Sequence, residues 1–285
     1  MAMNRTSIRL HDGPSMNVLD YPGGTEGQPP LLCLHGLTRN SRDFAEFAKR
    51  YSPRYRVIAP DFRGRGMSDF DPVPTRYNPL TYVGDVIQLL DEIGIPEALF
   101  VGTSLGGLVT MAIAATAPQR IAAAILNDVG PELSQAGLQR IATYVGKDER
   151  FNSWDEAAEA IAVNHGNLPA SFTRTDWLAM AHRLCRERNG FIVYDYDPAI
   201  ALPFAKGGAT PRVDLWPVFD ALAKKPLLMI RGERSDLLSE AAAERMKRAT
   251  PDADFAVVPG VGHAPSLSEP VAQAAIDAFL ESLPQ

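Results

Sequence analysis

The apolar positions along the chain form two patterns that alternate with each other. Short continuous apolar runs, which are typical of strands buried on both faces, lie at 31–34, 56–59, 99–101, 121–126, 226–230 and 255–258. Apolar residues at helical spacing predict helices over 41–50 (with Ser41 as the N-cap), 80–93, 105–116, 240–250 and 270–283. Strands that alternate with helices favour a mostly parallel sheet flanked by helices, which is an α/β fold.

Two segments depart from this alternation. Residues 6–10 and 16–21 alternate like a hairpin around the turn His-Asp-Gly-Pro. Residues 131–213 carry helical patterns (135–145, 155–164 and 175–188) and no signal of a buried strand. The sequence therefore predicts one core, formed by 1–130 and 214–285, that carries a helical cap inserted at 131–213.

Composition narrows the range of partners. The 285 residues carry a net charge of −6, and no block of lysine and arginine marks a phosphate-binding surface, so a nucleic-acid partner is not expected. Cys33 and Cys185 are the only cysteines, which indicates no disulfide framework and a reducing compartment. No stretch approaches the ~20 apolar residues of a membrane span. We expect a cytoplasmic protein that acts on a small molecule, and the oligomeric state stays open.

The segment Val-Gly-Thr-Ser-Leu-Gly-Gly at 101–107 carries the clearest chemical signal. It contains the motif G-x-S-x-G, with a predicted strand before it and a predicted helix after it. This motif places a serine on a strained turn at the carboxyl end of a sheet strand. The N-terminus of the following helix favours negative charge at the same point. The sequence predicts that Ser104 is a nucleophile, although serine also suits a turn that has no catalytic role.

A serine hydroxyl needs a base, and the base needs an orienting acid. The order expected for this motif is serine, acid, histidine. His263 lies in the loop after the last predicted strand, and Asp236 follows the strand 226–230. We predict His263 as the base and Asp236 as the acid, while a simple N-cap of the helix near Glu240 is the structural alternative for Asp236.

Two backbone amides are candidates for an oxyanion hole. One donor is expected from the residue after the nucleophile, and the other from the loop after an earlier strand. These positions are Leu105 and Leu37, the latter in the segment His35-Gly36-Leu37.

The segments LCLHGLTRNSRDF, APDFRGRGMSD, VGTSLGG, RGERSD and VPGVGHAPSLSEP resemble the α/β-hydrolase superfamily in its capped form, over nearly the whole chain. The resemblance implies the same roles for Ser104, His263, Asp236, Leu37 and Leu105. It also implies that His35 orders its loop and that the reaction needs no metal or cofactor.

The acid region departs from the family pattern. Many members have G-x-x-D, whereas Gly232 and Asp236 are one residue further apart. Glu233 is therefore a competitor, and Asp128, after the strand 121–126, is the alternative acid because some members supply the acid from that position.

The expected function is that of a serine esterase acting on a small carboxylic ester through an acyl-enzyme. A carbon–carbon bond hydrolase or a lactonase on the same fold is the alternative, and a binding protein without catalysis is the alternative from another class. The acyl and alcohol specificities are not encoded in any motif.

Overall fold

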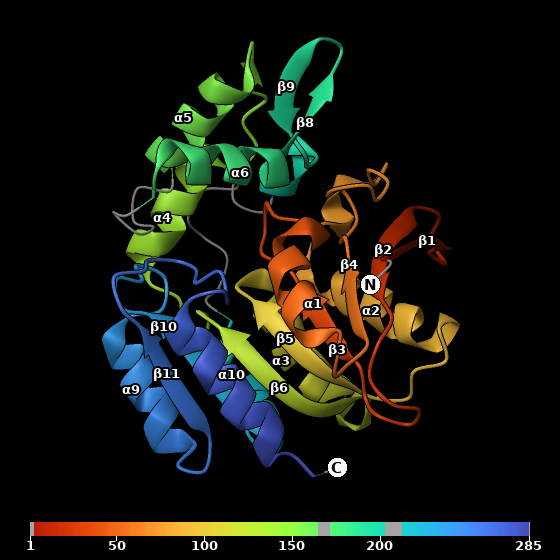
Figure 1. Ribbon diagram of the computed structural model, residues 1–285, viewed down its shortest axis with the longest axis vertical. Helices are drawn as coiled ribbons and strands as arrows, with labels where there is room; N and C mark the ends of the chain where they lie inside the picture. The colour runs from red at the N-terminus through yellow and green to blue at the C-terminus, as the bar shows by residue number, and fades with distance from the viewer. Residues whose placement is uncertain (1–2, 165–171, 203–212, 285) are drawn as a thin grey trace.

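The computed structural model describes residues 3–164, 172–202 and 213–284 (Figure 1). Its main sheet has eight strands in the order β1-β2-β4-β3-β5-β6-β10-β11. Their bounds are β1 Asn4–Arg9, β2 Ser15–Tyr21, β3 Leu31–Leu34, β4 Val57–Pro60, β5 Ala98–Thr103, β6 Ile121–Asn127, β10 Leu227–Gly232 and β11 Asp254–Val258. The β1–β2 and β2–β4 pairs are antiparallel and the others are parallel. The predicted α/β fold with a mostly parallel sheet is confirmed.

Helices cover both faces of this sheet. One face packs against α1 (Ala45–Tyr51), which follows the 3₁₀ turn η1 (Ser41–Phe44), and against α10 (Pro270–Ser282). The other face packs against α2 (Pro79–Glu92), α3 (Leu105–Thr116), α8 (Trp216–Leu222) and α9 (Glu240–Ala249). The remaining 3₁₀ turns are η2 (Pro74–Arg76), η3 (Pro118–Arg120) and η4 (Pro198–Ala201).

The central strands supply both cores in alternation. In β5, Ala98 and Phe100 enter the core on the α3 side, whereas Leu99 and Val101 enter the core on the α1 side. Because successive side chains of a strand point to opposite faces, a strand covered on both sides needs apolar residues at every position. This explains the continuous apolar runs in the sequence.

The described residues between β6 and α8 add no strand to the main sheet. They contain α4 (Gln135–Tyr144), β7 (Arg150–Phe151), α5 (Trp154–Asn164), α6 (Arg174–Leu184), β8 (Cys185–Arg188) and β9 (Phe191–Tyr194). The three strands described in this segment form a separate antiparallel sheet in the order β7-β9-β8. Figure 1 shows this segment beyond the ends of the parallel strands. Residues 165–171 and 203–212 of the expected cap lie outside the described residues, and the division into core and cap stays a prediction.

The sequence did not predict these small strands. A helix was expected over 175–188, but α6 ends at Leu184 and the chain continues as β8. Asn189 and Gly190 connect β8 to β9 with positive φ angles of 53° and 79°. Asn-Gly is a strong signal for a two-residue hairpin turn. The partly exposed flanking strands lack the continuous apolar run that identified the buried strands.

The first helix also begins differently from expectation. Asn40, not Ser41, caps η1, and its side chain accepts a hydrogen bond from Arg42 N. The Ser41 N–H instead donates to Asp61 Oδ1 at 2.6 Å. Among the described residues, no helix is both long and apolar enough to cross a bilayer.

The start of α3 presses directly on the sheet. A Cβ atom placed on Gly106 would lie 2.0 Å from the Leu34 carbonyl oxygen, and one placed on Gly102 would lie 2.7 Å from the Gly106 oxygen. Backbone atoms at these distances leave no room for a side chain. Glycine at both positions is therefore a packing requirement of the turn between β5 and α3.

We expect Gly106→Ala to lower the free energy of unfolding by about 3 kcal/mol, because the new methyl group must displace the backbone of β3. Gly84→Ala is the matched control: Gly84 lies in α2, and a Cβ there meets nothing within 4 Å. That variant is expected to gain roughly 0.5–1 kcal/mol from helix propensity. Urea unfolding of both variants tests the pair, and equal stabilities would contradict the packing argument.

Candidate active site

Ser104 lies on the sharp turn between β5 and α3. Its backbone has φ 51° and ψ −113°, a conformation that residues other than glycine rarely adopt. The Ser104 N–H donates to the Asn127 carbonyl oxygen at 3.0 Å. The packed glycines and this hydrogen bond hold the strained turn, so the hydroxyl is presented beyond the end of the sheet.

His263 connects Ser104 to a buried carboxylate. Its Nε2 lies 3.0 Å from Ser104 Oγ, and its Nδ1 lies 2.8 Å from Asp128 Oδ2. Asp128 directly follows β6 and is fully buried. An ionised carboxylate can only accept hydrogen bonds, so Nδ1 carries the proton and donates it in a hydrogen bond to Asp128. The lone pair on Nε2 is then free to accept a hydrogen bond from the Ser104 hydroxyl. These three side chains therefore have the arrangement of a nucleophile, a base and an orienting acid.

Asp128 has two further donors. The Gly232 N–H donates to its Oδ1 at 3.0 Å, and the Ser235 hydroxyl donates to its Oδ2 at 2.7 Å. The Leu238 N–H in turn donates to Ser235 Oγ at 3.1 Å. Ser235 stands three residues after Gly232, which is the position of the acid in G-x-x-D. In this chain that position supports the carboxylate and does not supply it.

The structure corrects the expected pairing of Asp236 with His263. The carboxylate that faces His263 Nδ1 belongs to Asp128, the alternative acid, whereas Asp236 forms an ion pair with Arg140 of α4. Burial raises the pKa of Asp236, but the Arg140 guanidinium outweighs it and holds that pKa below its usual value. The physical reason is spacing: Ser235 occupies the third position after Gly232 and faces Asp128, and Asp236, one residue later, faces Arg140 instead.

The two candidate oxyanion donors belong to the loop after β3 and to the start of α3. Neither the Leu37 nor the Leu105 N–H donates to another described residue. The Leu37 carbonyl oxygen accepts from Arg65 Nε at 2.9 Å, which fixes the peptide at one end. Leu105 begins α3 directly after Ser104. Both amides are thus available for an anion, and their role as an oxyanion hole stays a prediction.

His35 holds the Leu37 loop from inside the protein. Its Nδ1 lies 2.7 Å from the Gly36 carbonyl oxygen, and its Nε2 accepts the Phe62 N–H at 3.0 Å. The ring is fully buried, and burial lowers the pKa of His35 from 6.5 to about 4. These contacts agree with an ordering role for His35.

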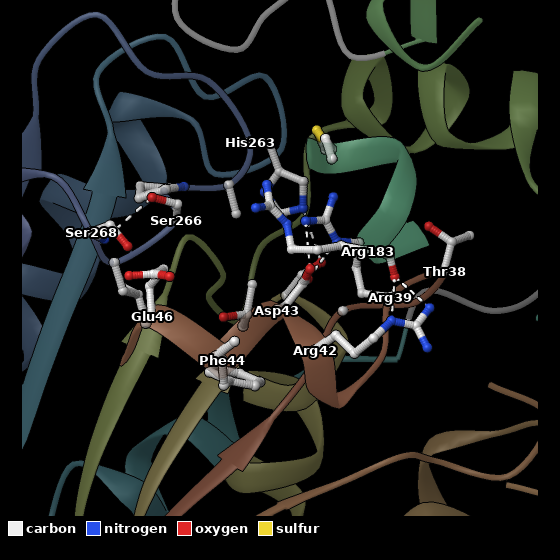
Figure 2. A pocket seen from close by; sticks show the side chains of 18 of the residues that line it. Thr38, Arg39, Arg42, Asp43, Phe44, Glu46, Arg183, His263, Ser266 and Ser268 are labelled. Carbon is white, nitrogen blue, oxygen red and sulfur yellow. Dashed lines mark hydrogen bonds and ion pairs between the residues drawn. The ribbon is translucent and has the colours of Figure 1, made fainter. Parts of the chain in front are cut away.

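Ser104 and His263 open into a cavity of about 680 Å³. Apolar side chains from the segment between β6 and α8 line it, among them Ile141, Tyr144, Phe172 and Met180. The core contributes the Leu37 loop and the residues after His263. Arg39, Arg42 and Arg183 also line this cavity (Figure 2). Within the described ranges, no three His, Cys, Asp or Glu side chains are arranged to hold a metal ion.

Comparisons with known proteins identify the family of this chain. A sequence model of the alpha/beta hydrolase family matches residues 31–276. The chain belongs to the α/β-hydrolase family. A crystal structure of an alpha/beta hydrolase from Novosphingobium aromaticivorans superposes with a TM-score of 0.93 at 46% identity, and the match covers 99% of each chain.

Two relatives match this α/β hydrolase over most of its length. The 3-hydroxybutyrate-oligomer hydrolase of Cupriavidus necator is 34% identical over 86% of this chain and 86% of its own. The 2-(acetamidomethylene)succinate hydrolase of Mesorhizobium japonicum is 30% identical over 87% of this chain and 85% of its own. The fold and the hydrolase family are thereby established.

The buried His35 predicts how stability depends on pH. The folded hydrolase keeps this ring neutral down to about pH 4, whereas the unfolded chain takes up a proton near pH 6.5. Its contribution is therefore complete above pH 6.5 and is lost as the pH falls towards 4, by roughly 3 kcal/mol in total.

We expect His35→Gln to flatten this part of the stability profile, because a neutral amide has no proton to gain. Urea unfolding at several pH values between 7 and 4 measures the effect. His11→Gln is the control, since His11 is exposed and bonds through its backbone N–H, which donates to Gln88 Oε1 at 2.9 Å. A His35→Gln profile as steep as that of the wild type would overturn the assignment.

Proposed function

We propose that this protein is a serine esterase that cleaves small carboxylic esters through an acyl-enzyme. The observation that carries the proposal is the hydrogen-bonded series from Ser104 through His263 to the buried Asp128, at the wall of a cavity of about 680 Å³. A hydroxyl that donates to an oriented neutral imidazole is an activated nucleophile.

In the first half of the reaction, Ser104 Oγ attacks the ester carbonyl carbon while its proton passes to His263 Nε2. Asp128 stabilises the imidazolium that forms, and the Leu37 and Leu105 amides donate to the developing oxyanion. The tetrahedral intermediate then collapses. The bond to the alcohol oxygen breaks, and that oxygen takes the proton from His263 Nε2, which leaves an ester on Ser104.

In the second half, water replaces the alcohol. His263 Nε2 removes a proton from the water as its oxygen attacks the acyl carbon, and the same amides hold the second oxyanion. The proton returns to Ser104 Oγ when the acyl bond breaks. The acid leaves, and the enzyme regains its first state without a metal or cofactor.

The relatives support an ester as the bond that is cleaved. The name of the Cupriavidus necator relative specifies oligomers of a hydroxy acid, whose units are joined by ester bonds. The second relative is named for a succinate derivative, so both substrates named are small organic acids or their oligomers. A lactone is a cyclic ester and undergoes the same attack, so lactones belong in any substrate panel.

The residues between β6 and α8 would act as the cap over this site. Ile141, Tyr144 and Met180 contribute apolar surface to the cavity that holds Ser104. A cap of this kind excludes water from the acyl group and selects the substrate by shape. A small organic molecule is the partner that fits such a cavity.

Ser104→Ala tests the nucleophile. We expect a fluorophosphonate probe to add a single mass to the wild type and none to the variant, because only an activated hydroxyl reacts. Turnover of p-nitrophenyl esters and short lactones should vanish with the same substitution. No adduct and no turnover on the wild type would instead indicate a binding protein that has kept the fold.

Asp128→Asn and Asp236→Asn distinguish the two candidate acids. An amide at 128 cannot orient the imidazole in the required tautomer, so kcat should fall by about 10³–10⁴. Asp236 faces Arg140, and its variant should lose about tenfold or less. Steady-state kinetics on one p-nitrophenyl ester decide between them. Equal losses in both variants would contradict the assignment of Asp128.

A further inference from the structure

Three arginines gather where the cavity meets α6, and two of them are paired. Arg39 donates to both carboxylate oxygens of Asp43, at 2.5 and 2.8 Å. Arg42 donates to Asp195 at 2.7 Å and to the Arg183 carbonyl oxygen at 2.6 Å. No hydrogen bond or ion pair joins the Arg183 guanidinium itself to another residue in the described parts of the chain. Of these three guanidinium groups, only that of Arg183 thus has no bonded partner among the described residues.

The position of Arg183 disfavours its positive charge. Its side chain is half-buried, and burial lowers the pKa of the guanidinium below its ordinary value. Asp43, Glu46 and Asp176 oppose this effect from a distance, whereas Arg39 adds to it. A partly desolvated cation without a bonded partner is unfavourable unless an anion joins it.

Arg39 lies close to the nucleophile, and Arg183 lines the same cavity. A Cβ atom placed on Gly36 would lie 3.3 Å from Arg39 Cγ and 3.7 Å from Ser104 Cβ, so these two side chains flank the same point. Arg183, Arg39 and Ser104 all line one cavity. Figure 2 shows the Arg39 side chain paired with Asp43 in this cavity. A group bound to Arg183 would thus belong to the same small molecule that Ser104 attacks.

We propose that Arg183 binds a free carboxylate of the substrate, with the Arg39–Asp43 pair beside it, so that the preferred substrates are short esters that carry one carboxylate. This inference rests on the proposed esterase function and names its substrate class. A carboxylate matches the planar fork of a guanidinium. A single negative charge is enough to pair with the Arg183 guanidinium.

Two pairs of substrates measure this preference, each with a carboxylate and its neutral amide. Monoethyl glutarate and ethyl 5-amino-5-oxopentanoate place the group on the acyl side. The acetyl esters of 3-hydroxybutyrate and of 3-hydroxybutanamide place it on the alcohol side. We expect the ratio of kcat/KM, carboxylate over amide, to exceed ten in one pair, which also tells the two sides apart.

Arg183→Gln is expected to lower that ratio at least tenfold. Arg174→Gln is the matched control, because Arg174 begins the same helix, is exposed and pairs with Asp155 at 2.6 Å. The control should keep the wild-type ratio. Ratios near one in both substrate pairs, or a preference that survives in Arg183→Gln, would overturn the inference.

A binding measurement separates this inference from the proposed function. Glutarate should bind Ser104→Ala, as measured by calorimetry, and should bind at least tenfold more weakly when Arg183→Gln is added. One possible result is that the wild type hydrolyses neutral esters and the probe labels Ser104, but glutarate does not bind. That result would overturn the carboxylate site and leave the esterase proposal standing. Glutarate binding without any ester turnover would overturn the esterase proposal and retain the site.

Discussion

The candidate site depends on one buried carboxylate. A charged group out of contact with water must have its acceptors satisfied, or it destabilises the fold. Asp128 meets this requirement with Gly232 from the end of β10, Ser235 from the loop that follows, and His263 from the loop after β11. These hydrogen bonds offset the cost of burying the Asp128 charge, and one of them also fixes the orientation of the His263 imidazole. Structure and proposed chemistry share one constraint at this point.

A second buried network holds the opposite side of the site. His35 ties Gly36 to Phe62, and Arg65 from the same loop donates to the Leu37 carbonyl oxygen. Asp61 accepts hydrogen bonds from the backbone of Ser41 and Met67. Hydrogen bonds from the loop after β4 thus fix the position of the loop after β3. An amide that must meet a developing oxyanion benefits from such pre-organisation.

Most of the main sheet could be predicted from the sequence because burial on both faces leaves a continuous apolar signature. The runs at 31–34 and 99–101 fall within β3 and β5, and the helix at 105–116 matches α3. The elbow at Ser104 was also predictable, because only glycine tolerates the contacts around it. The small sheet beside α6 was not, since its strands are partly exposed and only the Asn-Gly turn marks them.

The acid shows why a motif alone could not decide the site. Asp128 follows β6 and Asp236 follows β10, and both strands end at the same edge of the sheet. The topology therefore brings both residues towards His263. Two contacts distinguish them. Ser235, three residues after Gly232, donates to Asp128, and Arg140 on α4 forms an ion pair with Asp236. Arg140 and Arg183 both come from the segment that the sequence described least well. Their charges act on the site only through tertiary contacts. The spacing of residues in the sequence therefore does not predict which carboxylate pairs with each guanidinium.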